Sequence, residues 1–161
     1  MTNRTLKEDQ KFLSLTIQLA IENVKTGGGP FGAVVVRKGE LISESANQVT
    51  LLHDPTAHAE VLAIREAAKK LGSHTLDGCT IYSSTEPCPM CLGAIYWAGI
   101  EKLVFASSKA EAEKAGFIDA HIYREFGRSM KERSISTRHV ILPNAGDEFE
   151  AWLNKDEREV Y

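Results

Sequence analysis

Apolar residues recur every three to four positions in two long segments, the spacing that places them on one face of an α-helix. The first segment, residues 9–24, is followed by three consecutive glycines and Pro30, which break the pattern. The second segment, residues 56–71, starts at Thr56, a residue type that caps helices, and is followed by Gly72, a residue type that ends them. Both segments are therefore predicted to be amphipathic helices that pack on a core.

Shorter runs rich in β-branched and aromatic residues predict strands between the helices. The expected strands are residues 31–36, 41–49, 79–83, 101–106 and 135–142. Shorter helices are expected at residues 87–97 (where a loop runs into a helix), 120–126 and 148–153. Strands that alternate with helices favour an α/β fold with a mixed, largely parallel sheet and helices on both faces. In such sheets, ligands bind beyond the carboxyl ends of the strands.

Length and composition predict one domain over residues 1–161. Apolar residues make up 43% of the chain and charged residues 25%, which is ordinary for a globular protein with its own core. The net charge is −3, and the acidic residues of segment 147–161 would repel a phosphate backbone, so no nucleic-acid partner is expected. The polar N-terminus and the short uncharged run at 87–100 predict neither a signal peptide nor a membrane partner, and the expected location is the cytoplasm.

Two short motifs carry the candidate chemistry. His58-Ala59-Glu60 and Pro87-Cys88-Pro89-Met90-Cys91 together match the H-x-E…P-C-x-x-C pattern of zinc nucleobase deaminases. His58, Cys88 and Cys91 supply three zinc ligands and leave the fourth tetrahedral position for water, as catalytic zinc sites do. Zinc lowers the pKa of such a water from about 15.7 to about 7, which makes a nucleophile available at neutral pH.

Glu60 is the candidate for general acid–base catalysis. It stands two residues after His58, which on a regular helix would rotate it about 200° away and disfavour it as a further ligand. A C-x-x-C pair alone could be a redox pair or half of a structural zinc site. A second cysteine pair, which a structural site would need, is missing from the sequence, whose third cysteine is Cys79. Cys79 lies in an expected strand and is predicted to be a core residue.

Four longer stretches extend the match. GGPFGAVVV, HDPTAHAEVLAIR, EPCPMCLGAIYWAGI and EKAGFIDAHIYRE resemble bacterial guanine deaminases, members of the cytidine deaminase-like superfamily, and the resemblance covers nearly the whole chain. It implies a three-layer α/β/α sandwich with a five-stranded mixed sheet, and one Zn²⁺ per subunit. It also implies a homodimer in which the C-terminal segment, about residues 145–161, is exchanged and closes the partner's active site.

The same resemblance implies the residues around the substrate. Phe31 would stack on the purine, Asn47 would hydrogen-bond its polar edge, and Asp119 would assist catalysis beside Glu60. The remaining substrate-binding residues are Ala59, Trp97 and, from the exchanged tail, Tyr161. Taken singly, Phe31 and Trp97 could equally be core residues, Asn47 a turn residue, and Asp119 the cap of helix 120–126.

The expected activity is zinc-dependent hydrolytic deamination of guanine to xanthine and ammonia. Three alternatives stay open: deamination of a related amino-heterocycle or nucleoside such as guanosine, a pterin or a triazine; deamination of adenosine in tRNA; and a zinc protein without catalysis. A tRNA enzyme should carry a basic flank, and the acidic tail counts against it. The presence of Glu60 and an open zinc position count against a non-catalytic protein.

Overall fold

The structure is a computed structural model, and it describes residues 3–160. The chain divides into two units, Met1–Asp119 and Ala120–Tyr161. The first unit contains the sheet and the helices that cover it, and the second contains short helices joined by irregular chain. The predicted site residue Tyr161 lies outside the described residues.

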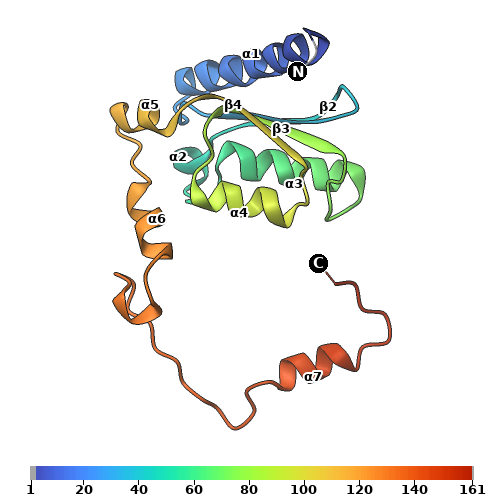
Figure 1. Cartoon of the computed structure of the whole chain (residues 1–161), viewed down its shortest axis with the longest axis vertical. Coiled ribbons are helices and arrows are strands. Elements are labelled where there is room, and N and C mark those ends of the chain that lie inside the picture. Colours follow the sequence, from blue (N-terminus) through green and yellow to red (C-terminus); the bar gives the residue numbers. More distant parts are fainter. Residues whose placement is uncertain (1–2, 161) are drawn as a thin grey trace. The chain divides into compact units, whose positions relative to one another are not determined.

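The sheet of the first unit has four strands in the order β2-β1-β3-β4 (Figure 1). They are β1 (Gly32–Arg37), β2 (Glu40–Ala46), β3 (Cys79–Thr85) and β4 (Lys102–Ser107). β1 is antiparallel to both β2 and β3, whereas β3 and β4 are parallel. The sheet is therefore mixed, as predicted, but the prediction that it is largely parallel is wrong. The chain returns from β1 into β2 through a tight turn at Lys38 and Gly39, both with positive φ, and this hairpin enforces antiparallel pairing.

The predicted fifth strand, residues 135–142, is irregular chain in this structure, and the sheet of the described residues has four strands rather than five. A strand needs a neighbour for its backbone N–H and C=O groups, and this segment has none among the described residues. Its apolar side chains are left exposed, with Ile135 at 77% and Ile141 at 80%. The residue types favour a strand, but the sequence does not show which strand this segment would pair with.

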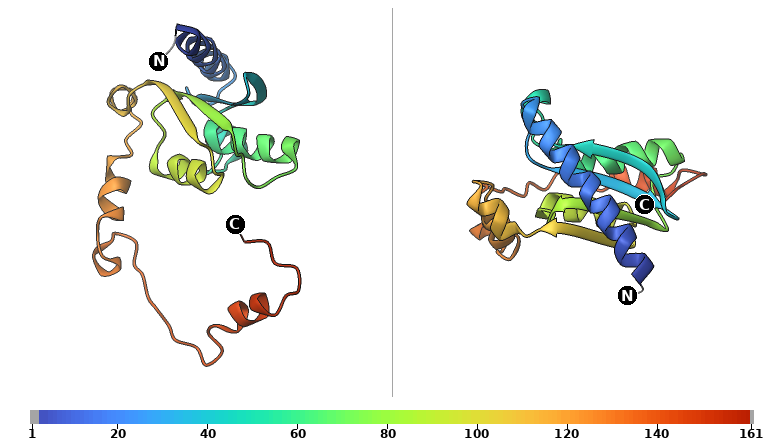
Figure 2. Two further views of the ribbon diagram at one scale, coloured as in Figure 1. Left: turned by 45° about the vertical axis from the view of Figure 1, so that its right-hand side comes forward. Right: turned by 90° about the horizontal axis from the view of Figure 1, so that it is seen from above.

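Helices cover both faces of the sheet, which confirms the three-layer arrangement (Figure 2). α1 (Asn3–Lys25) packs on one face, and α3 (Ala59–Leu71) and α4 (Pro89–Trp97) lie on the other. Alternate residues of β1 point to opposite sides: Val34 packs with Phe12 of α1, and Val35 packs with the α3 side. Because both faces are covered, β1 is a nearly continuous apolar run, and Cys79 of β3 is buried in the core as predicted.

The remaining helices are α2 (Val49–Leu52), α5 (Lys109–Lys114), α6 (Ala120–Phe126), the 3₁₀ helix η1 (Met130–Glu132) and α7 (Asp147–Leu153). The predicted helices at 120–126 and 148–153 are confirmed, whereas α2 and α5 were not predicted because each spans fewer than two turns. Among the described residues, no helix combines the length and apolarity that a bilayer crossing requires.

Candidate active site

Two helix starts bring the three predicted metal ligands together. His58 and Cys88 are the residues that precede α3 and α4, both in extended conformation, and Cys91 lies in the first turn of α4. The predicted helix start at Thr56 is wrong, because Thr56 instead donates its backbone N–H and its hydroxyl to Asp54 Oδ1 at 2.8 and 2.7 Å. His58 is thereby left at the end of an extended loop, with its side chain free to face Cys88.

The three donor atoms have the spacing of a tetrahedral zinc site. The sulfurs of Cys88 and Cys91 lie 3.6 Å apart, and His58 Nδ1 lies 3.5 Å from the first and 3.3 Å from the second. Zinc bonds of about 2.3 Å to sulfur and about 2.05 Å to nitrogen require edges of about 3.8 and about 3.6 Å in a regular tetrahedron. The observed edges are only a few tenths of an ångström shorter, so the residues present fit a zinc ion.

Without a metal ion, the three groups share their protons through hydrogen bonds. The hydrogen bond between Cys88 and Cys91 lowers the pKa of the Cys88 thiol to about 4, and His58 acts in the same direction. The same hydrogen bond and burial raise the pKa of Cys91. The hydrogen bond with Cys88 raises the pKa of His58. A bound cation reverses this balance, because it deprotonates the second thiol and requires a neutral imidazole.

Glu60 is buried beside this group, at 5% exposure in the first turn of α3. Its Oε1 accepts a hydrogen bond from Ser83 Oγ at 3.1 Å, and its Oε2 accepts one from Cys91 Sγ at 3.4 Å. Burial raises the pKa of this carboxyl group. The predicted helical rotation of Glu60 away from His58 is wrong, because His58 precedes α3 and is not part of the helix. Glu60 nevertheless contacts the metal-ligand group, because its Oε2 accepts the hydrogen bond from Cys91 Sγ.

Ser83 is a residue of this site that the sequence analysis missed. It lies on β3 with its side chain on the same face as Ile81, and it is 1% exposed. A hydroxyl buried on an apolar strand face requires a hydrogen-bond partner, and here that partner is the Glu60 carboxylate. The sequence signal that could have identified Ser83 is a polar residue at an inward-facing position of a buried strand.

Phe31 and Asn47 are joined at the neighbouring ends of β1 and β2. Asn47 donates its backbone N–H to Phe31 O at 3.0 Å, and its side-chain Oδ1 accepts a hydrogen bond from the Val49 N–H at 3.3 Å. Asn47 is buried, whereas Phe31 is half-buried and meets the ring of Phe117 edge-on at a centroid distance of 4.8 Å. A backbone hydrogen bond therefore holds these two predicted substrate-binding residues next to each other.

The other predicted substrate-binding residues differ in their surroundings. Ala59 is fully buried in the core cluster with Ala63 and Ile95. Trp97, at the end of α4, is 72% exposed, which removes the core alternative for this residue. Asp119 is half-buried at the end of the first unit.

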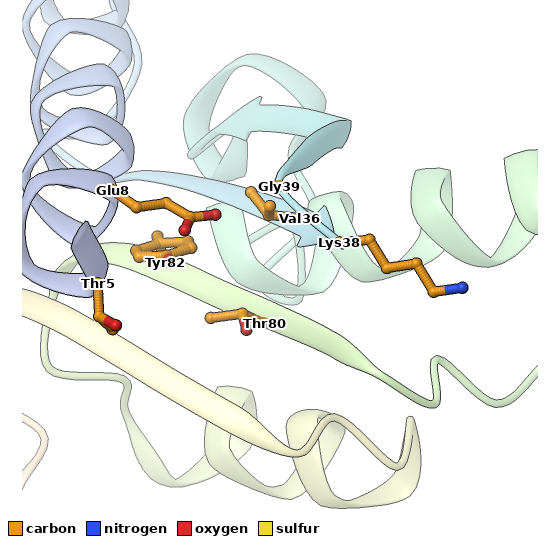
Figure 3. Close-up of a pocket in the computed structure, with 7 residues that line it drawn as sticks. All are labelled: Thr5, Glu8, Val36, Lys38, Gly39, Thr80 and Tyr82. Carbon is orange, nitrogen blue, oxygen red and sulfur yellow. The ribbon is translucent and has the colours of Figure 1, made fainter. Parts of the chain in front are cut away.

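A cavity of about 390 Å³ lies away from this site (Figure 3). It is on the α1 side of the sheet and contains none of the predicted site residues. Its lining residues are Thr5, Glu8, Val36, Lys38, Gly39, Thr80 and Tyr82. The chemistry is assigned to the α3–α4 side because the metal-ligating and acid–base groups meet there.

Residues 6–107 match the family described as the cytidine and deoxycytidylate deaminase zinc-binding region. The guanine deaminase of Bacillus subtilis (strain 168) is 48% identical over 153 residues, which cover 94% of this chain and 98% of that protein. An X-ray structure of guanine deaminase from Bacillus subtilis superposes with a TM-score of 0.92 at 46% identity, covering 100% of this chain and 99% of the other. The tRNA-specific adenosine deaminase of Aquifex aeolicus (strain VF5) is 44% identical over 96 residues, covering 60% of this chain and 64% of that protein.

Proposed function

The chain belongs to the cytidine and deoxycytidylate deaminase zinc-binding family, and we propose that it hydrolyses guanine to xanthine and ammonia. The observation that carries this proposal is the buried Glu60 carboxylate beside the His58, Cys88 and Cys91 group, in a chain that matches a guanine deaminase over nearly its whole length.

The extent of the similarity favours guanine over an adenosine in tRNA. The match to the tRNA-specific enzyme covers 60% of the chain, whereas the match to the guanine deaminase covers 94%. Segments outside the shared region usually determine which substrate a common catalytic centre accepts. The net charge of −3 and the acidic segment 147–161 point the same way, because a polynucleotide is attracted by basic surfaces.

His58, Cys88 and Cys91 hold one zinc ion in this proposal. When bound, zinc supplies a Lewis acid that makes water nucleophilic at neutral pH. The reaction forms a bond from the water oxygen to the ring carbon that bears the exocyclic amino group, and it breaks the bond from that carbon to the amino nitrogen. Glu60 accepts one proton of the water and passes it to the departing nitrogen, which leaves as ammonia, and the second proton of the water ends on the adjacent ring nitrogen of xanthine.

Ser83 fixes one oxygen of Glu60, so the other oxygen faces the zinc ligands and carries the proton. The hydrogen bond from Ser83 to Oε1 and the contact of Oε2 with Cys91 support this division of roles. An oriented carboxylate needs no rearrangement between taking up the proton and releasing it.

We further propose that Phe31, Asn47 and the Ala59 backbone N–H surround the purine. The Ala59 N–H is one of the first N–H groups of α3, which have no acceptor within the helix. Asn47 offers an amide whose orientation is fixed by the Val49 N–H. Trp97 lines the pocket, Asp119 assists proton movement, and Tyr161 approaches from the exchanged tail.

The proposed assembly is a cytoplasmic homodimer in which about residues 145–161 are exchanged. None of the described residues from 120 to 160 is buried, and Phe149 and Leu153 of α7 are 68% and 62% exposed. So many exposed apolar side chains indicate a surface that contacts another protein chain rather than water. Residues 135–142 would become the fifth strand on assembly, when the partner they lack becomes available.

The test is ammonia release by purified, zinc-loaded protein. Guanine, guanosine, adenine, cytosine and cytidine are offered side by side, with Glu60→Ala as the inactive control. Turnover of guanine that is lost in the control is expected. Turnover of another compound in the series, with guanine untouched, would retain the zinc chemistry and refute guanine as the substrate.

A further inference from the structure

Asn23, near the end of α1, is a buried polar residue that the catalytic scheme does not use. It is 6% exposed, and its side chain is fully engaged with the loop region. Its Nδ2 donates to Gly29 O at 2.8 Å and to Asn47 O at 2.6 Å, and its Oδ1 accepts a hydrogen bond from Gln48 Nε2 at 2.9 Å. One amide thus binds two separate backbone segments together.

The glycines that follow α1 pack so closely on Asn23 and Asn47 that a side chain in their place would not fit. A Cβ at Gly28 would overlap the Asn23 side chain, and a Cβ at Gly29 would come within 2.8 Å of Asn47 Oδ1. The Gly28 N–H in turn donates to Asn23 O at 2.9 Å. The loop therefore packs directly against Asn23 and Asn47, and a side chain at either glycine would push the loop away from these asparagines.

This cluster continues into the active site through backbone hydrogen bonds. Asn47 N–H donates to Phe31 O at 3.0 Å, and Gln48 N–H donates to Ala57 O at 2.9 Å. Ala57 immediately precedes the zinc ligand His58. Through these hydrogen bonds, Asn23 affects the positions of Asn47 and Phe31, the two residues proposed to hold the purine. The chain that follows Asn47 leads to His58 at the metal centre.

We propose that Asn23 is a positioning residue for substrate recognition, acting through Asn47 and Phe31. The inference rests on the proposed function in that it takes Asn47 to contact the substrate. Removing the amide leaves the buried Asn47 carbonyl oxygen without this donor and leaves Gly29 O with the Phe31 N–H alone, so the Gly29 and Asn47 segments are then free to shift. The Asn23 side chain hydrogen-bonds Gly29, Asn47 and Gln48 rather than Cys88, Cys91 or Ser83, so we expect metal binding and proton transfer to be retained.

Asn23→Ala tests this through separate measurement of KM and kcat. The KM for guanine is expected to rise about tenfold or more, with kcat within about threefold of wild type and zinc still near one per chain, because loss of uniform binding raises KM alone. Thr26→Ala is the matched control: it removes the hydrogen bond from Thr26 Oγ1 to Asn23 O at the same helix end, but Thr26 has no contact with Gly29 or Asn47. Asn23→Ser keeps one hydroxyl donor and should fall between wild type and Asn23→Ala.

A double-mutant cycle distinguishes positioning from general destabilisation. If Asn23 acts through Asn47, the Asn23→Ala/Asn47→Ala double variant should lose no more kcat/KM than Asn47→Ala alone. Losses that multiply would overturn the proposal, as would a KM within threefold of wild type in folded Asn23→Ala.

Hydrogen–deuterium exchange makes the test independent of the substrate. In Asn23→Ala, the amides of residues 28–31 and 46–49 should exchange faster, whereas those of 89–97 in α4 should be unchanged. Faster exchange in a protein that does not turn over guanine would refute the proposed function but retain the coupling. Unchanged exchange at 46–49 would refute the coupling whatever the substrate.

Discussion

Replacing Glu60 by glutamine should abolish turnover while the zinc site stays intact. Glutamine has the size of glutamate, so Oε1 can still accept the hydrogen bond from Ser83 and no cavity forms in the core. The amide nitrogen takes the place of Oε2 and can donate to the Cys91 thiolate. The amide cannot take up a proton at neutral pH, so the proton shuttle is lost and the geometry is kept.

The size of the effect follows from the role assigned to Glu60. General acid–base catalysis contributes about 10²- to 10⁴-fold, which corresponds to about 2.7 to about 5.4 kcal/mol of activation free energy. At 5% exposure, bulk water has little access to the position of the lost carboxylate, so rescue by solvent is minimal. The expected decrease is therefore in kcat, toward the upper part of that range.

The assay combines ammonia release from guanine with metal analysis of the same sample. Glu66→Gln is the matched control, since Glu66 is on the same helix, is exposed, and undergoes the same change of charge. Glu60→Gln should keep about one zinc per chain and Glu66→Gln should keep full activity. Activity within tenfold of wild type in zinc-loaded Glu60→Gln would refute the shuttle role.

Three further predictions concern the metal, the tail and the fold. Cys91→Ser should bind little zinc by metal analysis, and a variant that keeps one tightly bound zinc would contradict the ligand set. Deleting residues 155–161 should strongly reduce guanine turnover in the ammonia assay; full activity would make the tail dispensable. Burial opposes ionisation of Asp9, but hydrogen bonds from Lys102 and Tyr82 and the charge of Lys102 lower its pKa below the ordinary value of 3.8. Because the pKa is lowered on folding, ionised Asp9 stabilises the folded state at pH values above 3.8. This stabilisation is lost as the pH falls through the folded-state pKa of Asp9. The stability difference between zinc-free wild type and Asp9→Asn, measured by urea denaturation, should be constant above about pH 5 and shrink below about pH 4; a difference unchanged down to pH 3 would contradict this.

The zinc-ligand group and the buried Glu60 beside it were predictable because these residues fall in two short motifs. The H-x-E and C-x-x-C motifs each fix two functional groups at helix starts, and zinc chemistry constrains which residue types can serve. Ser83 and Asn23 were not predicted because their roles depend on neighbours 23 and 24 positions away. A single serine or asparagine carries no sign of such a partner.

The errors in the fold have a related origin. Hydrophobic patterning located the strands, but it does not indicate whether adjacent strands are parallel, and the Lys38–Gly39 turn decides that for β1 and β2. The segment 135–142 has strand-like residues without a partner in the described chain. Strand pairing is a long-range property, so β-propensity alone cannot establish it.

The most direct test of the central claim is guanine hydrolysis before and after zinc removal. Protein with about one zinc per chain should release one xanthine and one ammonia per guanine consumed, lose this activity on treatment with a chelator, and regain it when zinc is restored. Full guanine turnover by protein shown to be free of metal, or no turnover by fully zinc-loaded protein, would contradict the account.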